Sequence, residues 1–142
     1  MLDQQKKDAN HLQLLSIFHF VGALLAVFGI LFLLVHYTIF HALMENPKMW
    51  ENSKQGPPPE AFFEMFKMFK WFYLLGAVWF MCSGILNLIS AFCLRARKAR
   101  MFSLVVAAVN CLHVPLGTVL GIFTIIVLVR DSVVELYKEP RA

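Results

Sequence analysis

Three long stretches of the chain contain no charged side chain. No Asp, Glu, Lys or Arg occurs in residues 9–44, 71–94 or 101–129, and apolar residues dominate all three stretches. Each stretch is longer than the roughly 18 to 20 apolar residues that predict a membrane-spanning helix. The sequence therefore predicts an all-α integral membrane helical bundle, and it argues against a soluble globular domain.

The first two stretches predict two long helices. The first covers about residues 11–43 and contains no proline, and the second covers residues 71–94. An amphipathic segment that begins at Glu60 leads into the second helix, because its apolar side chains recur at helical spacing with charged residues on the other face. These apolar positions are Phe62, Met65, Phe66, Phe69 and Tyr73. We expect this segment to be a helical extension of the second span, placed at a membrane interface by its aromatic residues.

The third stretch, residues 101–129, fits neither one helix nor two ideal ones. A single straight helix would be about 43 Å long, against about 30 Å of hydrocarbon in a bilayer, and two helices would each be short. Pro115 and Gly117 lie near its middle, where they favour a break. We therefore expect a short helical hairpin broken at Pro115–Gly117, which gives four membrane helices. The alternative is one kinked third span, which would place the C-terminus on the opposite side.

The charged residues predict the orientation. The chain has 13 Lys and Arg against 9 Asp and Glu, a net charge of +4, and four of the basic residues lie in the connector 95–100. Basic residues in short connectors mark the cytoplasmic side, so both termini are expected there and residues 45–70 outside. This explanation of the charge leaves no reason to expect a nucleic-acid partner. We expect residues 1–142 to form a single transmembrane domain.

Small and amide side chains predict where the helices touch. Glycine and alanine let helix backbones approach closely, and amides form hydrogen bonds between helices. Gly117 and Gly121 form a GxxxG pair, which indicates a helix contact within or between protomers, although Gly117 can also complete the turn after Pro115. The predicted helix-packing residues are Gly22, Ala26, Gly76, Gly84, Asn87, Asn110, Gly117 and Gly121.

The histidines and methionines are the candidate metal ligands. His36 and His113 would both lie near the outer surface in the hairpin topology, where they could be the two axial ligands of a b-type haem. A copper site is a second hypothesis, since thioether ligands suit Cu(I). It would use His36 and His41 with Met44, Met49, Met65 and Met68. Interfacial hydrogen bonding by the histidines and ordinary apolar packing by the methionines are favoured, so no cofactor is expected.

The sequence predicts no catalysis. No carboxylate lies in an apolar stretch, and no nucleophile or phosphate-binding motif is found. The carboxylates lie in the 45–70 connector and at the chain ends, where we expect them to be solvated. The lack of any charged residue inside the spans also argues against an ion-coupled transporter.

Residues 110–137 resemble part of a known group of proteins. Their mark is the segment Pro115, Leu116, Gly117, Thr118, Leu120 and Gly121, followed by an apolar run and a short charged tail. The group consists of small multi-spanning bacterial membrane proteins of uncharacterised function. The resemblance implies a bacterial plasma-membrane location and no particular chemistry. The expected function is helix–helix assembly as an accessory subunit or homo-oligomer, and the alternative is a haem or copper redox protein using His36 and His113.

Overall fold

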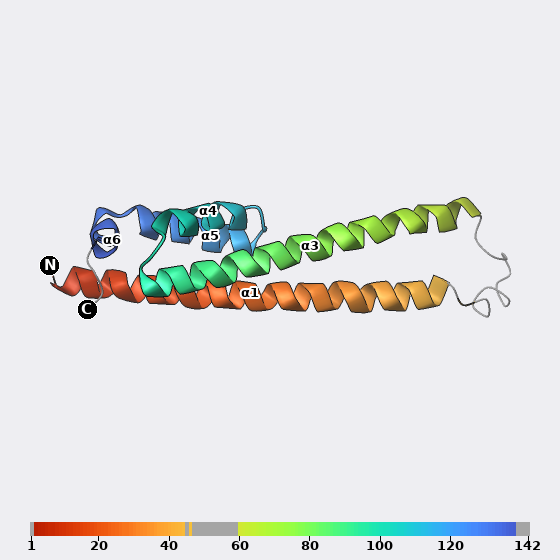
Figure 1. Cartoon of the computed structure of the whole chain (residues 1–142), viewed down its shortest axis with the longest axis horizontal. Coiled ribbons are helices and arrows are strands. Elements are labelled where there is room, and N and C mark those ends of the chain that lie inside the picture. The colour runs from red at the N-terminus through yellow and green to blue at the C-terminus, as the bar shows by residue number, and fades with distance from the viewer. Residues whose placement is uncertain (1, 45, 47–59, 139–142) are drawn as a thin grey trace. The chain divides into compact units, whose positions relative to one another are not determined.

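The computed structural model describes residues 2–44, 46 and 60–138. These residues form helices joined by turns, and they contain no β-strand, which confirms the all-α prediction. Figure 1 shows the helices in chain order. They are α1 (Leu2–Met44), α3 (Glu60–Ala96), α4 (Arg100–Asn110), α5 (Leu116–Val129) and α6 (Asp131–Leu136).

Two helices are long and apolar enough to cross a membrane. The spans with this character are Asp3–Met44 in α1 and Phe62–Ala96 in α3. Helix α1 begins nine residues before the predicted start at about residue 11, so its charged first turns are helical too. Helix α3 runs without interruption from Glu60, so the segment that begins there is a helical extension of the second long helix, as predicted. The side chain of Phe66, one of the predicted apolar positions, lies outside the described residues.

The chain divides into two compact units, and both long helices contribute to each. Unit 1 comprises Met1–Leu25 and Ser83–Ala142, and unit 2 comprises Ala26–Cys82. The apolar core of unit 1 brings together side chains from the first turns of α1, the end of α3, and α5 and α6. Its buried members are Leu12, Leu15, Leu94, Val127, Leu128, Val133 and Leu136.

The third uncharged stretch forms two helices that pack against each other, α4 and α5. The turn occupies residues 111–115, a few residues earlier than the predicted break, and Gly117 already belongs to the first turn of α5. The Cys111 amide donates a hydrogen bond to Ala107 O at 3.1 Å, which closes the end of α4. The Thr118 hydroxyl then donates to Cys111 O at 2.9 Å across the turn.

A tight turn joins α3 to α4 within the basic connector. The Lys98 amide donates to Cys93 O at 2.9 Å, and the Arg97 amide donates to Leu94 O at 3.3 Å. This pair of bonds is the Schellman arrangement, in which the residue after the helix is left-handed and usually glycine. Arg97 holds that position here with φ 52°, a conformation that a side chain disfavours.

Replacing Arg97 with glycine should therefore stabilise the fold. We expect Arg97→Gly to raise the free energy of unfolding by about 0.5 to 1 kcal/mol, because glycine adopts the left-handed conformation without strain. Arg95→Gly is the matched control. It removes the same charge from the last turn of α3 and should cost about 1 kcal/mol. Helicity followed during titration with a denaturing detergent measures both, and an equal shift in the two variants would contradict the explanation.

Candidate functional site

The centre of unit 1 is a reciprocal pair of side-chain amides. Asn87 Nδ2 donates to Asn110 Oδ1 at 2.9 Å, and Asn110 Nδ2 donates to Asn87 Oδ1 at 2.8 Å. Both residues are 4% exposed, and Asn87 Nδ2 also donates to Ser83 O at 2.9 Å. The pair joins α3 to α4 and leaves no amide oxygen without a donor. The two side chains therefore form hydrogen bonds between two helices.

Small residues place α1 against this amide pair. A Cβ added at Gly22 would lie 3.5 Å from Asn87 Oδ1, so α1 passes directly over the α3 amide. Ser16 donates to Ala91 O at 2.8 Å, and the Phe20 and Phe92 rings pack edge-to-face at 5.1 Å. In unit 1, α1 and α3 are therefore antiparallel and in direct contact.

Polar side chains are concentrated in the interior. Along most of each long helix the large apolar side chains are exposed instead, for example Phe28 at 58% and Leu75 at 65%. The buried polar residues are Asp8, Ser16, His19, Ser83, Asn87, Ser90, Ser103, Asn110 and Thr124. This distribution is the reverse of the one expected for a domain in water, where polar groups cover the surface.

His19 is a buried residue whose environment the sequence did not reveal. It is fully buried, and its Nδ1 lies 3.0 Å from Leu15 O in the preceding turn. A carbonyl can only accept, so Nδ1 carries a proton and donates this hydrogen bond. Its position in the helical repeat could have predicted this burial. Residues at intervals of three or four lie on one helix face, and Leu12, Leu15, His19 and Gly22 have this spacing.

The prediction that the terminal carboxylates are solvated is wrong for Asp8. Its side chain is completely buried, with Arg130 Nη1 at 3.8 Å and His11 Nδ1 at 4.0 Å from its Oδ1. Gln4 Nε2 also donates to the same carboxylate at 3.4 Å. The burial arises because residues 130–136, which pack in the core of unit 1, return to the first turns of α1.

Tyr137 follows α6 and packs against the core of unit 1. Burial raises the pKa of Tyr137 to about 12, and the charge of Cys93 acts in the same direction, whereas Arg100 and Arg97 lower it. Its hydroxyl is buried, and among the described residues it has no hydrogen-bond partner. The neutral phenol is therefore the form that the folded chain favours.

This shift predicts a stability that depends on Tyr137 at high pH. The folded pKa lies above the ordinary value of about 10, so the stabilisation is complete below about pH 10 and is lost as the pH rises through about 12. Tyr137→Phe should retain its stability across this range and match or exceed the parent at neutral pH, because it removes an unpaired buried hydroxyl. Unfolding in denaturing detergent at several pH values measures this. An equally steep alkaline loss in the phenylalanine variant would contradict it.

Unit 2 also pairs the two long helices through small residues. A Cβ at Gly29 would lie 2.8 Å from the Phe80 ring, and one at Gly76 would lie 3.2 Å from Leu33. Nearer the 45–59 connector, a hydrogen bond joins His36 Nδ1 to the Tyr73 hydroxyl at 2.6 Å. The predicted packing role of Gly76 thus corresponds to a close contact in unit 2.

The GxxxG pair faces α4. A Cβ at Gly121 would overlap Ala107 O and approach Cys111 Sγ to 2.6 Å. One at Gly117 would overlap the His113 Cβ in the turn and approach Asn110 O, at the end of α4, to 2.6 Å. Both glycines therefore form a helix contact within the chain. Ala26, at 5% exposure, is buried, and Gly84 is half-buried in α3.

The two predicted haem ligands lie in different units. His36 belongs to unit 2 and is paired with Tyr73, whereas His113 belongs to unit 1 and lies in the turn between α4 and α5. Among the described residues, no group of three or more His, Cys, Asp or Glu side chains is placed to hold a metal ion. The haem hypothesis thus stays a prediction.

The predicted copper ligands are only partly described. Met49 lies outside the described residues. Met65 and Met68 are 47% and 65% exposed on α3, and Met44 lines a pocket that also includes His41. The copper hypothesis stays a prediction as well.

Comparison of the chain with protein-family models, with curated proteins and with solved structures found no match.

Proposed function

We propose that this chain is a small, non-catalytic integral membrane protein of the bacterial plasma membrane. It acts through lateral helix contacts, either as a homo-oligomer or as an accessory subunit of a larger membrane complex. Its chemistry is that of assembly: polar and small side chains hold the helices together, and apolar side chains face lipid or a partner.

The distribution of polarity carries this proposal. In the most apolar window of α1 only 11% of the residues are buried, and in that of α3 only 28%. In water, contiguous exposed apolar surface of this extent would promote aggregation. In a bilayer it is the favourable arrangement, and the amide pair of Asn87 and Asn110 is the kind of interior hydrogen bond that joins membrane helices.

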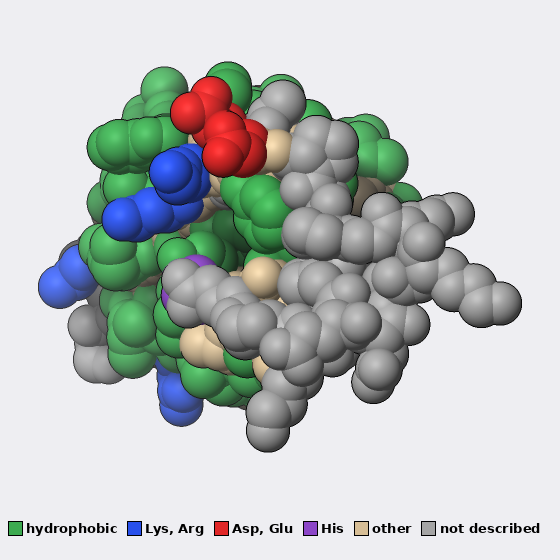
Figure 2. All heavy atoms as spheres, turned by 90° about the vertical axis from the view of Figure 1, so that its right-hand side faces the viewer, with side chains coloured by type: hydrophobic (Ala, Val, Ile, Leu, Met, Phe, Trp, Pro, Cys, Tyr) green, Lys and Arg blue, Asp and Glu red, His purple; other side chains and the backbone are tan. Residues whose placement is uncertain are grey.

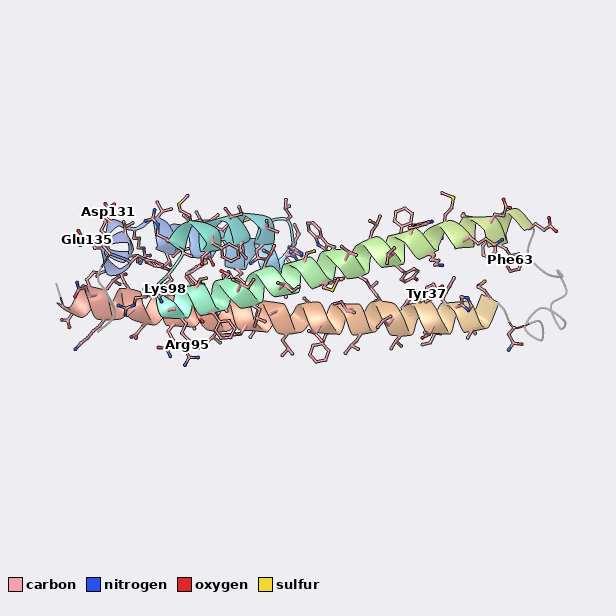
Figure 3. The ribbon with its side chains drawn as sticks, in the orientation of Figure 1. Tyr37, Phe63, Arg95, Lys98, Asp131 and Glu135 are labelled. Carbon is pink, nitrogen blue, oxygen red and sulfur yellow. The ribbon has the colours of Figure 1, made fainter. Side chains whose placement is uncertain are left out.

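Four membrane segments with both termini in the cytoplasm complete the proposal. The basic turn between α3 and α4, with Arg95 and Lys98 labelled in Figure 3, would lie on the cytoplasmic side. The turn between α4 and α5 would lie in the membrane or at its outer face. Its apolar side chains support this depth, because Leu112 is 70% exposed and Val114 is 81% exposed.

The apolar face of α1 that no internal contact covers supports lateral assembly. Gly22, Gly117 and Gly121 are engaged inside unit 1, so the internal packing is already close at these points. The outward face of α1 consists of large apolar side chains, with Phe32 67% exposed and Phe28 58% exposed. Such a face can pack against lipid or against the helix of a neighbour.

Two measurements test the proposal. The full-length chain, expressed at low level in a bacterium, should stay in the membrane pellet after an alkaline wash. Cross-linking in the native membrane, followed by extraction in a mild detergent, should then recover a homo-oligomer or one partner protein in fixed ratio. Release by the alkaline wash would reject the membrane location, and a chain recovered only as an uncross-linked monomer would reject the assembly function.

A further inference from the structure

A pocket with a volume of about 420 Å³ lies between the last turns of α1 and the first turns of α3, entirely within unit 2. Its walls are mostly aromatic. Tyr37 and Phe40 come from α1, and Phe63, Phe69 and Tyr73 come from α3. Figure 3 labels Tyr37 and Phe63 on the two helices that form the walls. The Tyr37 and Tyr73 rings, both in the lining, meet edge-to-face with centroids 5.3 Å apart.

The remaining lining residues give the pocket a positive charge. Lys67 and Lys70 are three residues apart on α3, so their side chains lie on one side of the helix, and His41 lines the pocket from α1. No Asp or Glu is among the lining residues that the structure describes. Both lysines are exposed, and neither forms an ion pair within the described part of the chain.

Charged and apolar side chains lie next to one another in the view onto this end of the two helices. Figure 2 shows Lys and Arg side chains beside a large hydrophobic area, with acidic side chains next to them. Glu64, three residues before Lys67, is exposed on α3 and does not line the pocket. Among the described lining residues, Lys67 and Lys70 therefore carry charge and no carboxylate does.

An occupant must match both properties. A small inorganic anion would leave the aromatic walls without a contact, and an apolar molecule would leave two ammonium groups without a counter-charge. A phospholipid satisfies both, because its phosphodiester accepts hydrogen bonds from ammonium groups and hydroxyls while its acyl chains cover aromatic rings.

We propose that this pocket binds the headgroup of an anionic phospholipid. The phosphodiester lies between Lys67 and Lys70, and the acyl chains run along Phe63 and Phe69. Two lysines against one phosphate favour a lipid that carries no cation of its own, so phosphatidylglycerol binds in preference to phosphatidylcholine. This inference rests on the membrane location proposed above.

The test uses the full-length chain in vesicles with equal amounts of phosphatidylglycerol and phosphatidylcholine. After extraction in a mild detergent, native mass spectrometry counts the lipids retained on each chain. We expect the parent to retain phosphatidylglycerol preferentially. Lys67→Gln with Lys70→Gln should lower this preference by roughly fivefold for each lysine, or about 30-fold together, at about 1 kcal/mol per basic residue. Lys6→Gln with Lys7→Gln removes the same charge from the start of α1 and should leave the preference unchanged.

Additional variants and controls distinguish the possible outcomes of this test. Lys67→Arg with Lys70→Arg keeps the charge and should keep the preference, whereas a loss equal to that of the glutamine variant would overturn the charge-based site. Displacement of the lipid by inorganic phosphate would also overturn it, since the pocket would then bind free phosphate. Equal retention of both lipids by a chain that resists an alkaline wash rejects the headgroup site alone. Release of the chain by that wash rejects the membrane location itself.

Discussion

Replacing Gly121 with alanine should open the hairpin formed by α4 and α5 and destabilise the fold by about 1 to 2 kcal/mol. The added Cβ would overlap Ala107 O, which is backbone and cannot rotate away, and it would approach Cys111 Sγ to 2.6 Å. Overpacking of this kind costs about 1 to 3 kcal/mol, and here it exceeds the gain of about 1 kcal/mol that alanine brings to a helix. Titration with a denaturing detergent, followed by circular dichroism, measures the loss.

A second readout reports where the structure opens. In a chain whose other cysteines, Cys82 and Cys93, are replaced by alanine, Cys111 should react faster with a maleimide when residue 121 is alanine. Gly22→Ala is the matched control, since its Cβ would lie at an ordinary 3.5 Å from Asn87 Oδ1. That variant should be neutral or up to about 1 kcal/mol more stable. If both alanines had the same effect, the close contact of α4 and α5 would be refuted.

Replacing Asn87 with leucine should cost about 1 to 3 kcal/mol. The change leaves the Asn110 amide, which is 4% exposed, without the donor and acceptor at 2.9 and 2.8 Å. Amide pairs between membrane helices span about 0.6 to 1.7 kcal/mol, so the larger part of the loss is the cost of an unpaired polar group. Asn110→Leu should have a similar effect. Unfolding free energies of the two variants measure both losses.

The double variant distinguishes pairing from simple loss of polarity. Asn87→Leu with Asn110→Leu removes both partners, so it should be considerably more stable than the sum of the two single losses predicts. The coupling energy from this double-mutant cycle should be about 1 kcal/mol or more. Losses that add without coupling would show that the two amides do not depend on each other.

Much of the fold follows from patterns in the sequence. The uncharged stretches predicted the two long helices, and Pro115 predicted that the third stretch would break. The reciprocal bond between Asn87 and Asn110 could be expected because these amides lie in apolar segments without charged partners. Uncharged amides of this kind find their best partner in each other.

Other features depend on tertiary contacts that periodicity does not report. From the sequence, Asp8 is expected to be a solvated charge near the start of the chain. Its burial depends on Arg130, which lies more than a hundred residues later. The sequence gives no sign that His19 differs from the other histidines, although it shares a helix face with Leu12 and Leu15. The pocket between Tyr37 and Lys67 likewise depends on which turns of α1 and α3 meet. Spacing along one helix identifies a face, but it does not identify what covers that face.

The lengths of α4 and α5 have a consequence for the surrounding lipid. At 1.5 Å per residue, their 11 and 14 residues extend about 16 and 21 Å, well short of the roughly 30 Å of a typical hydrocarbon core. In the proposed membrane setting, lipid next to this hairpin must shorten or tilt, at a cost of a fraction of a kcal/mol for each Å of mismatch. The chain would then gather where the bilayer is thin, so acyl-chain length could regulate where it accumulates.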